Sequence, residues 1–285
     1  RAASDKKVMV SCDADGREGD VLAWVAQRPH TLWVEERARY KVRNKWAKGI
    51  MQSGSAASTP LWDRGLRGEG QVVGIADTGI ATDLCYFHDP LHAVPFNAHN
   101  AQHRKIVYYR YDQFWGSDAD EEGHGSHTTG SLAGDAPEGS PEAAFNGMAP
   151  KAKIFFDDIF ANNDLMPPDD LDADLYPIPY QLGAVVRSES WGGDSFFYTA
   201  PAMETDKFAH EHREFLMVWA AGNEGDLGMF TIGSPATGKN MISVGAHYST
   251  AASLELQSGD SHYFQIDRSD GDPFTMAGAC ASGFG

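Results

Sequence analysis

Residues 72–79, with the sequence VVGIADTG, constrain the fold of this chain more than any other segment. Apolar and small residues run directly into Asp77, and a Thr-Gly pair then ends the run. The pattern is typical of a buried strand in a parallel α/β sheet, and in such sheets the chemistry lies at the carboxyl ends of the strands. An Asp at this position can equally begin a helix or shape a turn, so Asp77 alone does not separate a functional role from a structural one.

A histidine block, GHGSHTTGSLAG, occupies residues 123–134. Glycines flank His124 and small residues follow it closely, which predicts the start of a helix that packs tightly against the sheet. A histidine in the first turn of such a helix can face a carboxylate at a neighbouring strand end. The carboxylate would then fix the imidazole tautomer and stabilise the imidazolium form. A purely structural histidine is the alternative.

A third block, FLMVWAAGNEG, covers residues 215–225 and again predicts an apolar strand that ends in small residues. Asn223 stands where this strand stops, as Asp77 does at its own strand. A side-chain amide aimed into a site can stabilise a developing oxyanion, although an Asn here can also be an ordinary turn residue. Together the three blocks predict that an acid, an imidazole and an amide meet at one edge of the sheet.

The three blocks resemble those of the subtilisin-like serine peptidases, the subtilases. DTG at 77–79 is similar to the family's catalytic Asp block, HGSH at 124–127 to its catalytic His block and AGN at 221–223 to its oxyanion-hole Asn block. The order Asp, His and then Ser is typical of this family among the triad enzymes. Smaller matches at 190–192, 234–236 and 239–246 agree, so the resemblance covers roughly residues 61–247.

The resemblance implies a three-layer α/β fold, in which helices cover both faces of a mostly parallel sheet. It also implies a serine endopeptidase that hydrolyses peptide bonds in a polypeptide substrate. Asp77 would orient His124, His124 would act as the base, and Asn223 would donate to the oxyanion. Two strands would line the substrate: Ser190, Trp191 and Gly192 on one side, and Ala220, Ala221 and Gly222 on the other. Trp191 is larger than the family's usual residue and suggests an altered primary pocket.

The family's nucleophile block, Gly-Thr-Ser-Met-Ala-x-Pro, does not occur in this chain. Ser282 near the C-terminus is followed by Gly283-Phe284 rather than by Met-Ala. We therefore expect the chain to be a fragment that stops before its nucleophile and that has no protease activity by itself. The alternative is a non-catalytic subtilase-fold module, a pseudoenzyme that binds peptide or protein.

The charge and hydropathy of the chain limit its partners. Against 40 acidic residues there are 23 basic ones, a net charge of −17, whereas binding to nucleic acid needs a basic face. No apolar run approaches the roughly 18 residues of a spanning helix, so we expect no membrane span in this chain. The three cysteines, Cys12, Cys85 and Cys280, cannot all pair internally, and their pairing stays open. An extracellular or endomembrane location is implied by the family resemblance only.

The chain divides by composition near residue 55. We expect residues 1–55 to be an N-terminal extension, either ordinary or the end of a prodomain plus a linker at 52–60, and residues 56–285 to be an incomplete peptidase domain. In the extension, a short helix is predicted at 20–27 and a strand at 31–36. In the remainder, residues 157–182 are predicted to be a surface loop because they are rich in Asp and Pro. Helices are predicted at 124–134 and 201–213, and strands at 71–77, 105–111, 152–158, 183–190, 215–220 and 241–246.

Metal binding is the competing chemistry. A cation could in principle be gathered by His124, His127, Asp118, Asp120, Glu121 and Glu122. The two histidines lack the i,i+4 spacing and the Glu of the helical zinc motif, so we expect no catalytic metal. The acidic run at 169–174 fails the EF-hand template because Leu175 and Gln181 stand where Gly and Glu are required. We expect no cofactor, and a structural calcium ion stays open without assignable ligands.

Overall fold

A computed structural model describes residues 2–4, 7–8, 44–112, 116–120 and 122–246. The chain forms two compact units, Arg1–Lys41 and Val42–Gly285. Within the first unit, β1 (Ala2–Ser4) and β2 (Lys7–Val8) pair antiparallel. The helix expected at 20–27, the strand expected at 31–36, Cys12 and Cys280 all lie outside the described residues.

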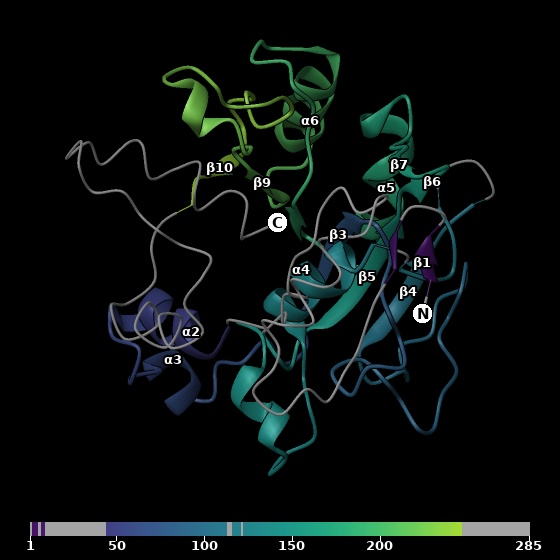
Figure 1. The fold of residues 1–285 in the computed structure, drawn as a ribbon, viewed down its shortest axis with the longest axis vertical. Coiled ribbons are helices and arrows are strands. Elements are labelled where there is room, and N and C mark those ends of the chain that lie inside the picture. The colour runs from purple at the N-terminus through teal and green to yellow at the C-terminus, as the bar shows by residue number, and fades with distance from the viewer. Residues whose placement is uncertain (1, 5–6, 9–43, 113–115, 121, 247–285) are drawn as a thin grey trace, which may run out of the picture. The chain divides into compact units, whose positions relative to one another are not determined.

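The second unit is built on a six-stranded sheet in the order β10-β9-β8-β3-β5-β4, in which every described pairing is parallel (Figure 1). Most of these strands are largely apolar, whereas β8 contains buried Arg187 and Glu189, and the positions of all six agree with the expected ones. They are β3 (Val72–Asp77), β4 (Ile106–Arg110), β5 (Lys153–Asp158), β8 (Val186–Glu189), β9 (Leu216–Ala220) and β10 (Ile242–Val244).

Strand β3 lies at the point where the strand order reverses. The next two strands of the sheet in the sequence, β4 and β5, lie on one side of it, and β8, β9 and β10 lie on the other. Connections that leave such a strand on opposite sides open a crevice at the carboxyl edge, where ligands of α/β sheets bind. The fold therefore places the end of β3, which is Asp77, at the favoured position for a site.

Two hydrophobic clusters cover the two faces of the sheet. On one face, Ile75 and Phe156 pack with Ala133 of α4 (His124–Ala133). On the other, Ala76 and Trp219 pack with Phe208 of α6 (Ala200–Glu211). Adjacent residues of β3 thus point to opposite clusters, as the alternation of side chains along a strand requires. This arrangement confirms the expected α/β class with helices on both faces.

The expectation of a surface loop over residues 157–182 is wrong. Within it lie β6 (Phe160–Ala161), β7 (Asp164–Leu165), the π-helix η2 (Leu171–Leu175) and α5 (Pro177–Gln181). Asp170 caps η2 by accepting a hydrogen bond from the Ala173 N–H at 2.9 Å, and Pro177 occupies the first position of α5. Asp and Pro are here helix-start residues rather than loop residues, and Leu171 and Leu175 are buried in the core.

Several short elements complete the unit. The linker expected at 52–60 overlaps α2 (Asn44–Ser53) and α3 (Pro60–Asp63), whose ends are joined by a 3.1 Å hydrogen bond from the Leu61 N–H to Gln52. Two 3₁₀ turns, η1 (Pro141–Phe145) and η3 (Gly225–Leu227), lie in connections. The domain boundary near residue 55 stays a prediction. Cys85 is a free, exposed thiol.

Candidate active site

Asp77 is the last residue of β3 and its side chain is only 1% exposed. Its Oδ1 accepts a hydrogen bond from the Thr78 N–H at 2.7 Å. The neighbouring strand β5 also ends in an acid, and Asp158 pairs in register with Asp77. Burial raises the pKa of Asp158 to about 7, although the hydroxyl of Tyr109 donates to it at 3.0 Å.

His124 is the first residue of α4, and its Nδ1 lies 2.7 Å from Asp77 Oδ1. Small residues make this approach possible. Gly123 begins the helix at a φ of 83°, a conformation that favours glycine. A Cβ on Gly125 would lie 2.2 Å from the carbonyl oxygen of Gly79 just beyond the strand. The structure therefore brings the predicted acid and the predicted base into contact.

A third residue completes the contacts of the Asp77 carboxylate. Thr128 Oγ1 donates to Asp77 Oδ2 at 2.8 Å, while Oδ1 holds His124. Thr128 is not among the residues predicted from the sequence. Its signal was its spacing, because residues four apart in a helix share a face and Thr128 follows His124 by four.

The electrostatic surroundings favour a protonatable imidazole at His124. The hydrogen bond to Asp77 raises its pKa, the charges of Asp77 and Asp120 add to this, and partial burial opposes it. The side chain of His124 remains 30% exposed, so it is open to a reacting group. His127 differs, since burial and the neighbouring His124 lower its pKa. Within the described ranges, no group of three or more His, Cys, Asp or Glu residues is placed to hold a metal ion.

The two strands predicted to line the substrate reach the same edge of the sheet. Ala76 of β3 pairs with Glu189 of β8, and Glu189 pairs with Trp219 of β9. The residues that follow, Asp77, Ser190 and Ala220, are therefore level with one another. The 190–192 segment thus starts beside the end of β3, and the 220–222 segment starts one strand further along the same edge.

Trp191 is held by a buried ion pair beneath it. Its indole N–H donates to Glu189 Oε2 at 2.8 Å, and its ring packs edge-on against Trp219 with centroids 4.6 Å apart. Glu189 also accepts a 2.6 Å hydrogen bond from Arg187, whose side chain is fully buried. Burial raises the pKa of Glu189, and the charge of Arg187 opposes that rise. The orientation of Trp191 is therefore fixed from the core side.

Asn223 lies in the loop that follows β9, and it is exposed. Its backbone N–H donates to Glu224 Oε2 at 2.8 Å. The left-handed residue of this turn is Gly222, with a φ of 108°, and not Asn223. Among the described contacts, none joins Asn223 to Asp77 or to His124, so the structure brings together two of the three predicted catalytic residues.

Two serines downstream of Asn223 are described, and both have structural contacts. Ser234 Oγ forms a hydrogen bond with Thr199 Oγ1, and Ser243 Oγ donates to the carbonyl of Ala236. The later serines, Ser282 included, lie outside the described residues. Neither described serine contacts His124, and neither sits in a nucleophile-like block.

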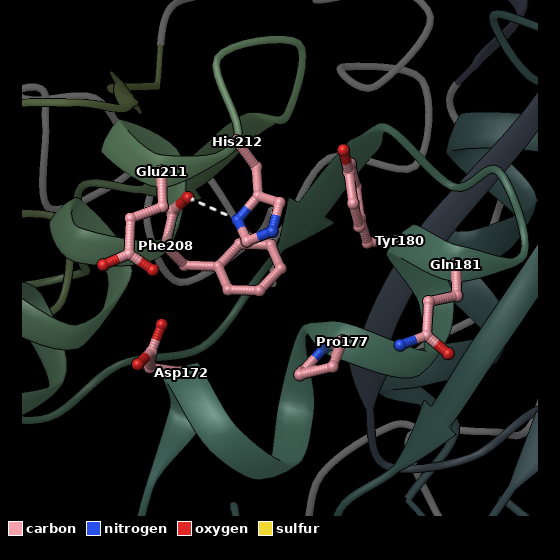
Figure 2. Close-up of a pocket in the computed structure, with 7 residues that line it drawn as sticks. All are labelled: Asp172, Pro177, Tyr180, Gln181, Phe208, Glu211 and His212. Atoms are coloured by element: carbon pink, nitrogen blue, oxygen red, sulfur yellow. Dashed lines mark hydrogen bonds between the residues drawn. The ribbon is translucent and has the colours of Figure 1, made fainter.

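A separate pocket of about 280 Å³ lies between η2, α5 and α6 (Figure 2). Its lining contains none of the predicted site residues. Asp172 in this pocket already forms an ion pair with Lys207. The lining residues are Asp172, Pro177, Tyr180, Gln181, Phe208, Glu211 and His212.

Comparison with known proteins gives one family. The model of the subtilase family matches residues 68–281. The serine protease/ABC transporter B family protein tagD of Dictyostelium discoideum is 36% identical over 256 residues, which are 84% of this chain and 14% of that protein. The corresponding tagB protein is 34% identical over 246 residues, 83% of this chain and 13% of its own length. The chain thus spans about one seventh of the relatives it matches.

Solved structures give more distant likenesses. The psychrophilic subtilisin-like protease Apa1 from Pseudoalteromonas sp. AS-11 is 22% identical with a TM-score of 0.44, over 61% of this chain and 36% of that one. The CspB protease of Clostridium perfringens is 22% identical with a TM-score of 0.41, over 58% and 39%. Across the described residues, no helix is both long and apolar enough to cross a membrane.

Proposed function

This chain belongs to the subtilase family of serine peptidases, and we propose that it supplies the acid and the base of a subtilisin-type endopeptidase whose serine nucleophile lies outside it. The observation that carries the proposal is the 2.7 Å contact between Asp77 and His124 at the carboxyl edge of the sheet. An imidazole bound to a buried carboxylate through Nδ1 has its other nitrogen free to act as a general base.

The contact between Asp77 and His124 supports the following reaction. The serine hydroxyl attacks the scissile carbonyl while His124 accepts its proton. Asp77 holds the imidazole in one tautomer and stabilises the imidazolium. His124 then protonates the leaving amine, and water repeats the sequence on the acyl-enzyme. The amide of Asn223 donates to the oxyanion. In subtilisin itself, removal of the Asn with this role lowers kcat by roughly 10²–10³.

The substrate is proposed to be an extended polypeptide that lies between two strand ends. The 190–192 and 220–222 segments follow parallel strands that are separated by one ladder of hydrogen bonds. Gly192 and Gly222 leave backbone groups accessible, because neither carries a side chain and both are exposed. Backbone hydrogen bonds along such an edge favour a peptide over a compact ligand.

The full-length protein tests the proposal through hydrolysis of a mixed peptide library. His124→Ala should abolish turnover, because no other described imidazole contacts Asp77. His99→Ala is the matched control, since His99 is exposed and has no described contact with Asp77 or His124. Retention of turnover in His124→Ala contradicts the assignment. Absence of turnover in the unsubstituted full-length protein favours the non-catalytic, peptide-binding alternative.

The relatives' names join a serine protease to an ABC transporter, and we extend the proposal to a longer protein of that kind. The transcript beyond Gly285 should encode first a Gly-Thr-Ser-Met-Ala-like block and later an ATP-binding cassette. A stop codon directly after Gly285 contradicts both expectations. The extracellular or endomembrane location stays a prediction.

A further inference from the structure

One carboxylate outside the Asp77–His124 pair contacts the segments on which both residues lie. Asp120 Oδ1 accepts from the Thr78 hydroxyl at 3.0 Å and from the Gly123 N–H at 2.8 Å. Its Oδ2 accepts from the Ser126 N–H at 2.7 Å. Asp120 therefore binds the residue after Asp77, the residue before His124 and the residue two positions after His124.

Thr78 completes this connection from the strand side. Its hydroxyl donates to Asp120 and at the same time accepts from the Gly125 N–H at 2.8 Å. Backbone N–H groups in the first turn of a helix have no partner within the helix, and a carboxylate there also interacts favourably with the helix dipole. Asp120 and Thr78 together satisfy three such groups, those of Gly123, Gly125 and Ser126.

Close packing limits movement of this arrangement. A Cβ on Gly79 would lie 2.4 Å from the carbonyl oxygen of Ala119, the residue before Asp120. The loop that carries Asp120 is thus pressed against the turn that leaves β3. A shift of the loop would have to move either the strand end or the helix start.

We propose that Asp120 is a positioning residue for the Asp77–His124 pair, which holds the first turn of α4 against the end of β3 through Thr78. The inference rests on the proposed function only for its effect on catalysis. The metal alternative gave Asp120 a different role, that of a ligand. All three of its described hydrogen bonds instead join protein groups.

The charge of Asp120 also reaches several titrating groups. It acts with Asp77 to raise the pKa of His124, and His127, whose own pKa is lowered, is the other titratable neighbour on the same helix. It adds to the raised pKa values of Asp158 and Tyr109 on the neighbouring strands. Removal of this charge should therefore lower the pKa of His124. The general base is the neutral imidazole, so the acidic limb of the kcat/KM profile should move to lower pH.

Two readouts on Asp120→Asn test the inference. NMR titration of the His124 ring in the 285-residue chain should show a lowered pKa, with the signal assigned by its loss in His124→Gln. In the full-length enzyme, kcat/KM should fall on the order of tenfold as the pair loses its alignment, and the acidic limb should move to lower pH. Asp158 titrates nearby, and the NMR signal separates its contribution from that of His124.

Thr78→Val distinguishes the effect of the Thr78–Asp120 hydrogen bond from the effect of the Asp120 charge. It removes the hydroxyl and keeps the Asp120 side chain, so kcat/KM should fall while the acidic limb stays in place. Thr78→Ser keeps the hydroxyl and should restore activity to within about threefold, because the hydrogen bonds remain. These variants also serve if Asp120→Asn does not fold.

The possible outcomes distinguish failure of the positioning role of Asp120 from failure of the proposed peptidase function. An unchanged His124 titration in folded Asp120→Asn overturns the inference whether or not the enzyme is a peptidase. Wild-type kcat/KM in Thr78→Val overturns it as well. Absence of peptidase activity in the unsubstituted full-length protein rejects the proposed function, and a lowered His124 pKa in Asp120→Asn then still supports the contact between Asp120 and the His124 segment.

Discussion

A Cβ atom on Gly125 would lie 2.2 Å from the carbonyl oxygen of Gly79, closer than any real contact of this kind allows. The first turn of α4 and the turn after β3 therefore touch through two residues without side chains. Because His124 and Asp77 sit one and two positions away, the same contact sets the distance between acid and base.

Replacing Gly125 with Ala tests this relationship. The added methyl must push the helix away from backbone atoms, which should cost about 1–3 kcal/mol in the free energy of unfolding. The kcat/KM of the full-length enzyme should fall on the order of 100-fold, since the His124–Asp77 contact lengthens. Gly130→Ala in the same helix is the control, because its Cβ would meet only Phe87 at 3.8 Å. It should stabilise the protein by about 0.5–1 kcal/mol in denaturant titrations. Equal stability of the two variants would contradict the argument.

Thr128 is expected to matter through the hydrogen bond of its hydroxyl to Asp77, which is shorter than its contact with the Gly125 carbonyl. Thr128→Val keeps the shape of the side chain and removes the donor to Asp77 Oδ2. A hydrogen bond to a charged group contributes about 1.5–3 kcal/mol, so kcat/KM should fall on the order of tenfold or more. Thr128→Ser keeps the hydroxyl and should stay near the wild-type value. Steady-state kinetics on the three proteins decide the point, and a serine variant as impaired as the valine variant would assign the effect to packing.

The pH dependence of stability follows from the raised pKa of His124. A histidine whose pKa is higher in the folded state binds its proton more tightly there than in the unfolded chain. Its contribution is therefore complete at pH values below the unfolded pKa of about 6.5 and is lost as the pH rises through the folded pKa. The free energies of unfolding of wild type and His124→Gln should differ more at about pH 5.5 than at about pH 9 in denaturant titrations. A difference that grows with pH would have the wrong sign.

The sequence predicted the elements that carry the site more fully than the contacts within it. Apolar stretches identified the central strands β3 and β5, because a strand buried on both faces has few polar positions. The signal is weaker for β8, which contains Arg187 and Glu189, and for the exposed β10. The strand order that makes β3 the reversal point is a tertiary property without a local signal. Thr128 escaped notice, and Asp120 was considered only as a metal ligand, for a related reason. A Thr in a small-residue helix and an Asp in an acidic loop look ordinary until their hydrogen-bond partners are known.

The errors came from residues with two structural meanings. Asp170 and Pro177 suggested a loop, yet each begins a helical turn whose apolar residues enter the core. Composition alone cannot distinguish the two cases, because helix starts and loops favour the same residue types.

Asp157 should be a determinant of stability rather than of activity. It is fully buried between Arg110 and Arg187, and Arg187 donates to it at 2.7 Å. Asp157→Asn leaves a buried guanidinium with less compensation and should cost about 3–5 kcal/mol in the free energy of unfolding. Asp172→Asn, at the exposed Lys207 pair, is the control and should cost much less, because water screens exposed ion pairs and they contribute little to stability. Denaturant titration measures both variants. A small loss of unfolding free energy in Asp157→Asn would show that the ion pairs of Asp157 with Arg110 and Arg187 contribute little to stability.

Trp191 should set the choice of side chain next to the scissile bond, because its indole is fixed in place by Glu189 and Trp219. Trp191→Phe keeps an aromatic ring but loses the N–H, which leaves Glu189 with one hydrogen-bond donor fewer. This variant should therefore lose some stability while keeping the preference for the substrate side chain. Trp191→Ala opens the space and should shift cleavage of a peptide library towards larger side chains, since one added methylene in a pocket changes discrimination by roughly 10-fold or more. All three proteins are assayed as full-length enzymes. For each, the deciding quantity is the ratio of kcat/KM for peptides with a large side chain to kcat/KM for peptides with a small one. An unchanged ratio in Trp191→Ala would place the primary pocket elsewhere along the edge of the sheet.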